Sequence, residues 1–266
     1  MLGWLRRLRP PPPIPEPAWQ ATLARYPFLA ARSADAVERL RRLAAEFLRD
    51  KEFHGAHGFV ITDEVALAVA AQAVLPVLHL PGGLRWYDDF VGIVIHPSEA
   101  VARRKTVDET GVVHEYEEVL AGEAMDRGPV MLSWQDVLAG SITQEAGYNV
   151  VIHEFAHKID MRSGTADGCP PLPAGFAGTR SARDARVAWF SVLQPAYEDF
   201  RERTIVAERF GGEAPWLDAY GATSPGEFFA VACEAYFVNR AKLASEFAGL
   251  AKLFDEFFRR PTEGQD

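Results

Sequence analysis

Apolar positions recur with helical spacing towards both ends of the chain and give way to strand-like runs in its middle. In the segment 33–48 they fall on one face of a helix that the Ser33 side chain can cap. The same reasoning predicts further helices over 18–26, 62–75, 149–160, 182–203, 225–239 and 241–260. Runs of β-branched and aromatic residues between turn residues predict strands over 90–97, 114–122 and 129–138. Because the strands cluster between helices rather than alternate with them, the pattern favours an α+β fold.

The first 17 residues differ in composition from the rest of the chain. Their sequence, MLGWLRRLRPPPPIPEP, places three arginines before a run of prolines. A signal peptide would continue with an apolar stretch, whereas polyproline is extended and has no internal hydrogen bonds. We therefore expect a disordered lead over 1–17 and a single domain over 18–266. Within this domain we expect a helical N-terminal part over about 18–80 and a core over about 85–260.

Charge and cysteine content bear on the partners and the compartment of the protein. The formal net charge of −9 and the pI near 5.3 disfavour a nucleic-acid-binding surface, which is usually basic. The segment 65–84 has no charged residue, but its prolines, glycines and polar side chains favour a buried helix and a turn over a membrane span. Two cysteines far apart in sequence, Cys169 and Cys233, favour a reducing compartment. We expect a soluble protein without membrane or direct nucleic-acid contacts.

The segment NVVIHEFAHKID, residues 149–160, places two histidines four residues apart in an otherwise apolar helix. His153 and His157 project from one helix face, so they could present two imidazoles to one zinc ion. Glu154 lies beside that face, where it could take a proton from a water at the metal. Burying three such side chains is costly unless a ligand satisfies them, which favours a metal site over an ordinary buried helix.

A catalytic zinc site needs a third protein ligand, and no histidine follows His157. The best-placed carboxylate is Glu227, for which the alternative is a capping box with Ser224 at the start of the same helix. Ligating histidines usually need a hydrogen-bond acceptor on their other ring nitrogen. Glu234, on the same helix face as Glu227, and Asp160, three residues past His157, could supply it. An exposed helix end is the alternative for Asp160.

Three further assignments stay open at this level. The Tyr220 hydroxyl, in a loop just before the Glu227 helix, could donate to an oxyanion, although spacing alone favours a loop aromatic that packs on the core. The strand in 128–138 could lie at a sheet edge, where an extended peptide would pair with it, or in the sheet interior. The helix 182–203 and the Gly/Pro-rich loop before it either shape the cleft or only pack.

Five blocks of the sequence, in their order along the chain, resemble the Mlc titration factor A family of zinc metallopeptidases. The resemblance covers nearly the whole chain after the lead. The blocks are FLRDKEFHGAHGFVITDEVALAVAAQAVLPVLHL, WYDDFVGIVIHPSEA, GPVMLSWQDVLAG, GYNVVIHEFAHKIDMRSG and YGATSPGEFFAVACEAYF. The last two are also similar to the catalytic domain of anthrax lethal factor, a gluzincin-like peptidase. The resemblance implies a zincin-like metallopeptidase domain with a small mixed sheet, an HExxH active-site helix and flanking helices.

The resemblance also implies a set of site residues. One zinc ion (Zn2+) per chain would be held by His153, His157 and Glu227, with Glu154 as general base and Tyr220 as oxyanion donor. The sequence departs from the lethal-factor pattern in one place. Val231 stands four residues after the ligand glutamate, where gluzincins have an acid, and Glu234 is the expected substitute.

Two functions follow as hypotheses. Family members are described as cytoplasmic and aminopeptidase-like, which implies a zinc-dependent peptidase that hydrolyses peptide bonds. One member binds Mlc, a glucose-responsive transcriptional repressor, which implies instead, or in addition, a regulatory protein that sequesters a repressor and has an accessory zinc site. A purely structural zinc ion would need four protein ligands, and three argue against it. We expect a monomer.

Overall fold

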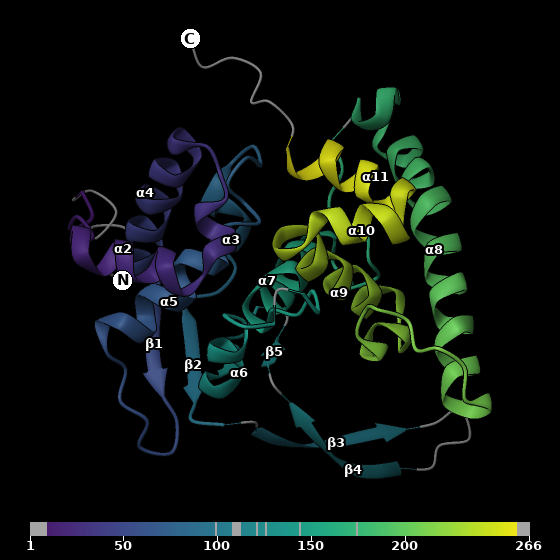
Figure 1. The fold of residues 1–266 in the computed structure, drawn as a ribbon, viewed down its shortest axis with the longest axis horizontal. Helices are drawn as coiled ribbons and strands as arrows, with labels where there is room; N and C mark the ends of the chain where they lie inside the picture. Colours follow the sequence, from purple (N-terminus) through teal and green to yellow (C-terminus); the bar gives the residue numbers. More distant parts are fainter. Residues whose placement is uncertain are drawn as a thin grey trace.

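The computed structural model describes residues 10–259, apart from 99, 108–112, 121, 126, 144 and 174. Figure 1 shows N-terminal helices on one side of the molecule, C-terminal helices on the other, and α7 (Val150–Asp160) between them. The N-terminal group comprises α2 (Glu16–Arg25), α3 (Pro27–Ala30), α4 (Ala34–Asp50) and α5 (Asp63–Ala73). The C-terminal group comprises α8 (Ala182–Phe210), α9 (Pro225–Val238), α10 (Arg240–Glu246) and α11 (Ala248–Phe258). Within the described ranges, no helix combines the length and the apolar character that crossing a membrane requires.

Side-chain caps set where α4 and α5 begin. Ser33 accepts a hydrogen bond from the backbone N–H of Ala36 at the start of α4, and Thr62 caps α5 in the same way. Residues 1–9 of the predicted lead lie outside the described part of the chain. Its later part packs on α4: Ile14 is buried, and the Ile14 carbonyl accepts a hydrogen bond from Arg41. The packed chain therefore begins before the expected boundary, because an apolar side chain in the proline run contacts a helix.

The central sheet is small and mixed. Its order is β1–β2–β6–β5, in which β1 (Glu52–Gly55), β2 (Gly92–His96) and β6 (Val130–Ser133) are parallel and β5 (Gly122–Ala124) pairs antiparallel with β6. A separate antiparallel pair, β3 (Ala100–Val107) and β4 (Val113–Leu120), extends away from this sheet (Figure 1). Alternate side chains of β2 and β6 are buried: Ile93, Ile95, Val130 and Leu132. Helices around a small mixed sheet agree with the predicted α+β class.

The predicted strand over 129–138 ends early. Its strand part stops at Ser133, whose hydroxyl accepts a hydrogen bond from the Asp136 N–H and caps α6 (Trp134–Ala139). The sequence does not reveal this change, because the apolar run continues from the strand into the helix. A serine within a strand also cannot be told from a serine at the start of a helix. Since β6 lies between β2 and β5, the segment is an interior strand, and β5 occupies the edge.

Two predicted helices also end elsewhere. The segment 241–260 forms two helices, α10 and α11, because the Phe247 backbone leaves the helical region, with φ −133° and ψ 65°. The helix predicted over 182–203 continues to Phe210, where Gly211 adopts the left-handed conformation (φ 74°) that ends many helices. Neither difference changes the residues around α7.

Aromatic side chains surround α7 and hold it in the core. All of its residues are buried. The Phe155 ring lies 5.6 Å from that of Phe47 and 5.0 Å from that of Tyr87, measured between centroids. On the C-terminal side, Trp189 of α8 stacks on Phe254 of α11 at 5.9 Å. Well-packed cores of this kind hold side chains in fixed rotamers, so a site on α7 rests on a rigid support.

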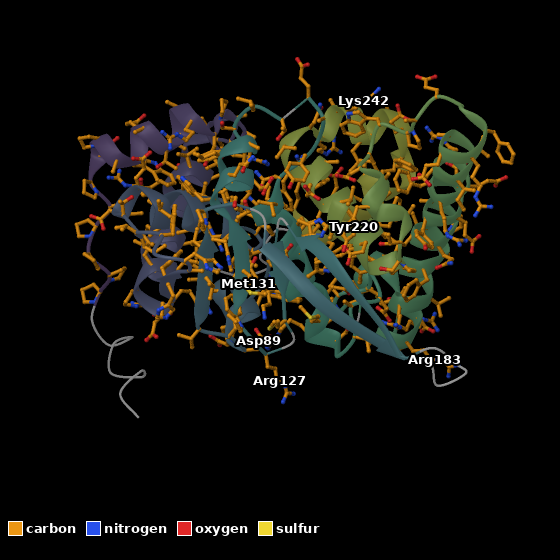
Figure 2. The ribbon with its side chains drawn as sticks, turned by 90° about the horizontal axis from the view of Figure 1, so that it is seen from below. Asp89, Arg127, Met131, Arg183, Tyr220 and Lys242 are labelled. Atoms are coloured by element: carbon orange, nitrogen blue, oxygen red, sulfur yellow. The ribbon has the colours of Figure 1, made fainter. Side chains whose placement is uncertain are left out.

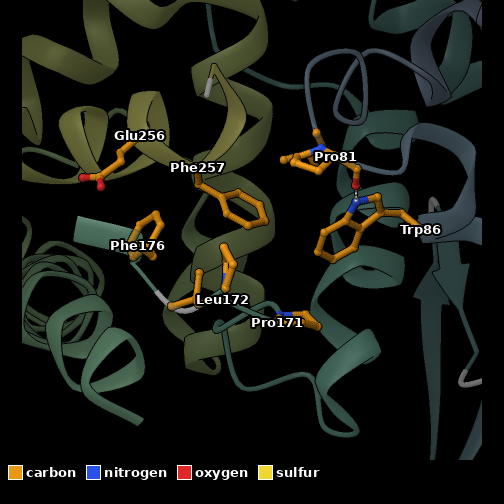
Figure 3. Close-up of a pocket in the computed structure, with 9 residues that line it drawn as sticks. Pro81, Trp86, Pro171, Leu172, Phe176, Glu256 and Phe257 are labelled. Carbon is orange, nitrogen blue, oxygen red and sulfur yellow. Dashed lines mark hydrogen bonds between the residues drawn. The ribbon is translucent and has the colours of Figure 1, made fainter. Parts of the chain in front are cut away.

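A pocket of about 300 Å³ lies apart from the sheet, between the loop after α5 and the C-terminal helices (Figure 3). Its walls are mostly proline and aromatic side chains: Leu80, Pro81, Trp86, Pro171, Leu172, Pro173, Phe176, Glu256 and Phe257. The Trp86 indole N–H is already used, because it donates to the Pro81 carbonyl at 3.0 Å. None of these lining residues belongs to the candidate site described next.

Candidate metal centre

Two capped helices bring the predicted ligands together. Asn149 caps α7 by accepting a hydrogen bond from the Ile152 N–H at 3.0 Å, and Ser224 caps α9 through the Glu227 N–H at 3.2 Å. Ser224 thus supplies its half of the capping box that was the alternative for Glu227, but the Glu227 carboxylate lies at the histidines of α7, 3.1 Å from Nε2 of each ring. Helix α9 packs directly on α7, which fixes this approach.

The three donor atoms form a compact triangle. His153 Nε2 and His157 Nε2 are 3.2 Å apart, and each lies 3.1 Å from Glu227 Oε2. Ligands at about 2.0–2.1 Å from a tetrahedral metal ion would be separated by roughly 3.3 Å. The observed separations agree with that value, so the triangle fits a single metal ion. In the described ranges, these three residues form a group of histidine and carboxylate side chains whose ligand atoms lie close together.

Opposing effects set the charges in the triangle. Burial raises the pKa of Glu227, but hydrogen bonds from His153 and His157 outweigh it and hold this pKa well below the usual range. Burial lowers the pKa of His153, but hydrogen bonds to Glu227 and Glu234 outweigh it and raise this pKa well above the ordinary value. The arrangement therefore favours a positive charge held next to a carboxylate, which is what a bound cation would provide.

Glu154 lies outside the triangle and is only 4% exposed. Burial raises its pKa to about 7, against the lowering effect of His153 and His157. Its side chain touches the backbone of Gly122 in β5: a Cβ atom added there would lie 2.5 Å from Glu154 Oε1. A carboxylate with a pKa near neutrality, beside a metal site and under an edge strand, has the properties of a general base.

Glu234 lies where the sequence places it, behind His153. Its Oε1 accepts a hydrogen bond from His153 Nδ1 at 2.8 Å, and its Oε2 accepts one from the Asn149 N–H at 2.5 Å. The Asn149 side-chain amide in turn donates to Gln72 of α5 at 2.7 Å. Sequence reasoning did not assign Asn149 and Gln72 to the site. The available signal was a cap residue next to the motif and a lone amide in an apolar helix.

Asp160 is buried rather than at an exposed helix end, and its carboxylate contacts the loop that follows α7. Its Oδ2 accepts a hydrogen bond from the Gly168 N–H at 2.7 Å, while Oδ1 is buried without a hydrogen-bond partner among the described residues. Burial raises the pKa of Asp160 to about 7. Asp160 therefore ties the loop after α7 to the helix, and its predicted role towards His157 stays a prediction.

Tyr220 lies at the open side of the centre. Its side chain is 42% exposed, and its ring centroid is 6.2 Å from that of His153. The Asp218 carboxylate accepts a hydrogen bond from the Tyr220 N–H at 2.9 Å and so shapes the short helix η4 (Ala219–Ala222). Figure 2 shows Tyr220 in front of the C-terminal helices, on the face that β3 and β4 cross. The residue is not packed on the core, contrary to what spacing alone favoured.

Comparisons with known proteins agree with this centre. The family model described as glucose-regulated metallo-peptidase M90 matches residues 3–259. Mlc titration factor A of Edwardsiella ictaluri is 34% identical over 261 residues, which cover 98% of this chain and 94% of that protein. Mlc titration factor A of Serratia proteamaculans is 33% identical over 261 residues, with 98% and 93% covered. An uncharacterized protein of Synechocystis is 32% identical over 259 residues, with 97% and 88% covered. The matches confirm the resemblance seen in the sequence, and the chain belongs to the glucose-regulated metallo-peptidase M90 family.

Proposed function

We propose that the chain is a zinc-dependent peptidase of the gluzincin type, with a zincin-like catalytic domain. The observation that carries the proposal is the triangle of His153, His157 and Glu227 with the buried carboxylate of Glu154 beside it. A structural zinc site would take four protein ligands. The described part of the chain offers three, which leaves a position for a water or a substrate oxygen.

The chemistry follows from the placement of each side chain. A zinc ion held by the three ligands would make a water more acidic and polarise a carbonyl group. Glu154, with a pKa near neutrality, takes the proton of the attacking water and returns it to the leaving amine. The Tyr220 hydroxyl donates a hydrogen bond to the oxyanion that forms. Glu234 holds the His153 ring in the orientation that leaves Nε2 for the metal.

Strand β5 supports a peptide as the substrate. It lies at the edge of the sheet and passes over Glu154, so an extended chain that paired with it would run across the site. The substrate-pairing role considered for 128–138 therefore passes to 122–124. The family resemblance supports an aminopeptidase-like form of this activity, on short peptides with a free amino end. We further propose that the protein acts as a cytoplasmic monomer; its two cysteines are free and buried, as in a reducing compartment.

One variant tests the mechanism. Glu154→Gln removes the base without removing a ligand, so it should abolish cleavage of aminoacyl reporters and longer peptides while zinc content stays at one ion per chain. Glu246→Gln, in α10, is the control for loss of a carboxylate elsewhere. Retained cleavage in Glu154→Gln would refute the role of Glu154. A zinc-loaded wild-type protein that cleaves no member of the panel would refute the peptidase itself.

A second candidate function rests on the relatives. Two of them are named for titration of Mlc, which suggests that this chain binds a transcriptional repressor. Co-purification of a repressor with the wild type and with His153→Ala would separate the two functions. Binding that survives loss of the metal makes the interaction independent of catalysis, and absence of binding in both proteins removes this candidate.

A further inference from the structure

Helix α7 carries two pairs of side chains with four-residue spacing, and each pair faces a different partner. His153 and His157 face the carboxylate of Glu227. Glu154 and Lys158, one residue further round, form the second pair, since residues four apart lie on the same side of a helix. Glu154 contacts strand β5, and Lys158 contacts the turn that follows β5. One face of α7 thus serves the metal and the neighbouring face serves the edge strand.

Lys158 makes these contacts from the protein interior. It is fully buried, and its Nζ donates to the carbonyls of Met125 at 2.5 Å and Gly128 at 2.9 Å. These two carbonyls frame the turn between β5 and β6, because the Gly128 N–H also donates to the Met125 carbonyl. The ammonium lies 4.6 Å from the centroid of the Phe90 ring. Burying an ammonium is expensive, and an apolar side chain would fill the same space more favourably, so its charge has a specific use at this turn.

Gly122, at the other end of β5, shows how closely the strand lies on the site. A Cβ atom there would lie 2.5 Å from Oε1, 2.7 Å from Cγ and 2.8 Å from Cδ of Glu154, so a side chain at this position would require Glu154 or the strand to move. The strand is therefore fixed on α7 at both ends, by contact with Glu154 and by the hydrogen bonds of Lys158. Its other edge faces no strand of the described sheet.

We propose that Lys158 is a positioning residue that holds the free edge of β5 over the metal centre and thereby sets the affinity for peptides long enough to pair with that edge. The inference rests on the proposed peptidase function. A substrate with one residue on each side of the scissile bond gains little from β5, whereas a longer peptide gains backbone hydrogen bonds along it. Lys158 therefore affects how tightly longer peptides bind rather than the rate of the chemical step.

Kinetics on two substrates test this. Lys158→Met keeps most of the aliphatic volume and removes the donors. In zinc-loaded protein we expect the KM of a hexapeptide to rise about tenfold more than that of a single aminoacyl reporter, the effect of weakening one or two backbone hydrogen bonds. Zinc content should stay at one ion per chain. Equal changes for both substrates, or no change for the hexapeptide, would overturn the proposal.

Lys51 provides a matched control. It is another buried lysine whose Nζ donates to two carbonyls, those of Tyr87 and Phe90, and lies over the Phe90 ring, but at β1 rather than at β5. Lys51→Met should lower the melting temperature without any dependence of KM on substrate length. If Lys158→Met does not fold, Lys158→Arg, which keeps the charge but changes its reach, serves the same comparison. Lys158→Arg must also raise the KM of the hexapeptide more than that of the reporter, and equal changes in the two KM values overturn the proposal.

Amide hydrogen exchange gives a readout that needs no catalysis. We expect peptides spanning 122–128 to exchange about tenfold faster in Lys158→Met than in the wild type, while α9 stays protected in both. Unchanged exchange over 122–128 would overturn the positioning role even in an active enzyme. Faster exchange in a protein without peptidase activity would leave the positioning of β5 standing and refute only the proposed function.

Discussion

The carboxylate of Glu234 lies 2.8 Å from Nδ1 of His153, on the side of the ring opposite to the metal site. Glu227, two turns earlier on the same helix, lies 3.1 Å from Nε2 of that ring. Helix α9 therefore contacts both nitrogens of one histidine, once at the predicted metal position and once behind it. A metal ion that displaced the proton between Nε2 and Glu227 would leave the Nδ1 proton held by Glu234, the tautomer that a metal-binding histidine requires.

Replacing Glu234 with Gln should weaken metal binding. The amide keeps an acceptor for His153 but loses the charge that makes the ring a better ligand, so we expect zinc affinity to fall about tenfold to a hundredfold. Competition with a chromogenic chelator measures this directly. Glu246→Gln in α10 is the control. Unchanged zinc affinity in Glu234→Gln would show that Glu234 supports the fold alone.

The residues of the candidate metal centre could be predicted because much of their geometry is local. The four-residue spacing of His153 and His157 places both rings on one helix face, whatever the rest of the fold does. Glu227 required a further argument, that no histidine follows the motif and that a zinc site needs a third ligand. Its local signal was ambiguous, since a serine three residues before a glutamate also fits a capping box; the Ser224 hydroxyl does cap the helix, while the Glu227 carboxylate lies at the histidines.

The surroundings of the site could not be predicted in the same way. Gln72 and Asn149 are 77 residues apart, and nothing in either local pattern indicates that they meet. The contact between Gly122 and Glu154 depends on the sheet order, which places a short antiparallel strand outside β6. The change from strand to helix at Ser133 could not be predicted either, because β6 and α6 lie in one continuous apolar run.

Tyr220→Phe should reduce catalysis without disturbing the protein. The Tyr220 residue is 42% exposed and its ring centroid lies 6.2 Å from that of His153, so we expect the variant to keep its fold and its bound zinc. Loss of one oxyanion donor typically lowers kcat about a hundredfold. Single-turnover kinetics with the zinc-loaded variant measure this effect. Tyr197→Phe, which removes the hydroxyl that donates to the Ala222 carbonyl, is the control. A kcat within about twofold of the wild-type value would exclude Tyr220 from the reaction.

Gly122→Ala should displace Glu154, the proposed general base. The new Cβ cannot remain 2.5 Å from Glu154 Oε1, so either the carboxylate or strand β5 must move. We expect kcat/KM to fall at least about tenfold for reporters and for longer peptides alike, because the base itself is affected. Gly212→Ala, whose Cβ would meet nothing closer than 3.7 Å, should leave activity unchanged. Full activity in Gly122→Ala would mean that β5 lies further from Glu154 than the structure places it.

The buried carboxyl group of Asp160 should make the stability of the protein depend on pH. Burial raises its pKa in the folded protein to about 7, above its value of 3.8 when exposed. Between these values the folded state holds a proton that the unfolded state has released, so the free energy of unfolding falls as the pH rises from 4 to 7. Its orphan oxygen Oδ1 is the structural reason, because a charge there has no partner among the described residues.

Asp160→Asn should remove this dependence. The amide oxygen can still accept the hydrogen bond of the Gly168 N–H, and the side chain stays neutral at every pH. In metal-free protein we expect similar stability for the variant and the wild type near pH 4, and a variant more stable by on the order of 4 kcal/mol at pH 8. Urea unfolding of both proteins across this range measures the difference. Asp167→Asn, in the same loop and more exposed, is the control. A variant that loses stability equally at both pH values would show that Asp160 is held as a carboxylate by a stronger partner, as the predicted contact with His157 requires.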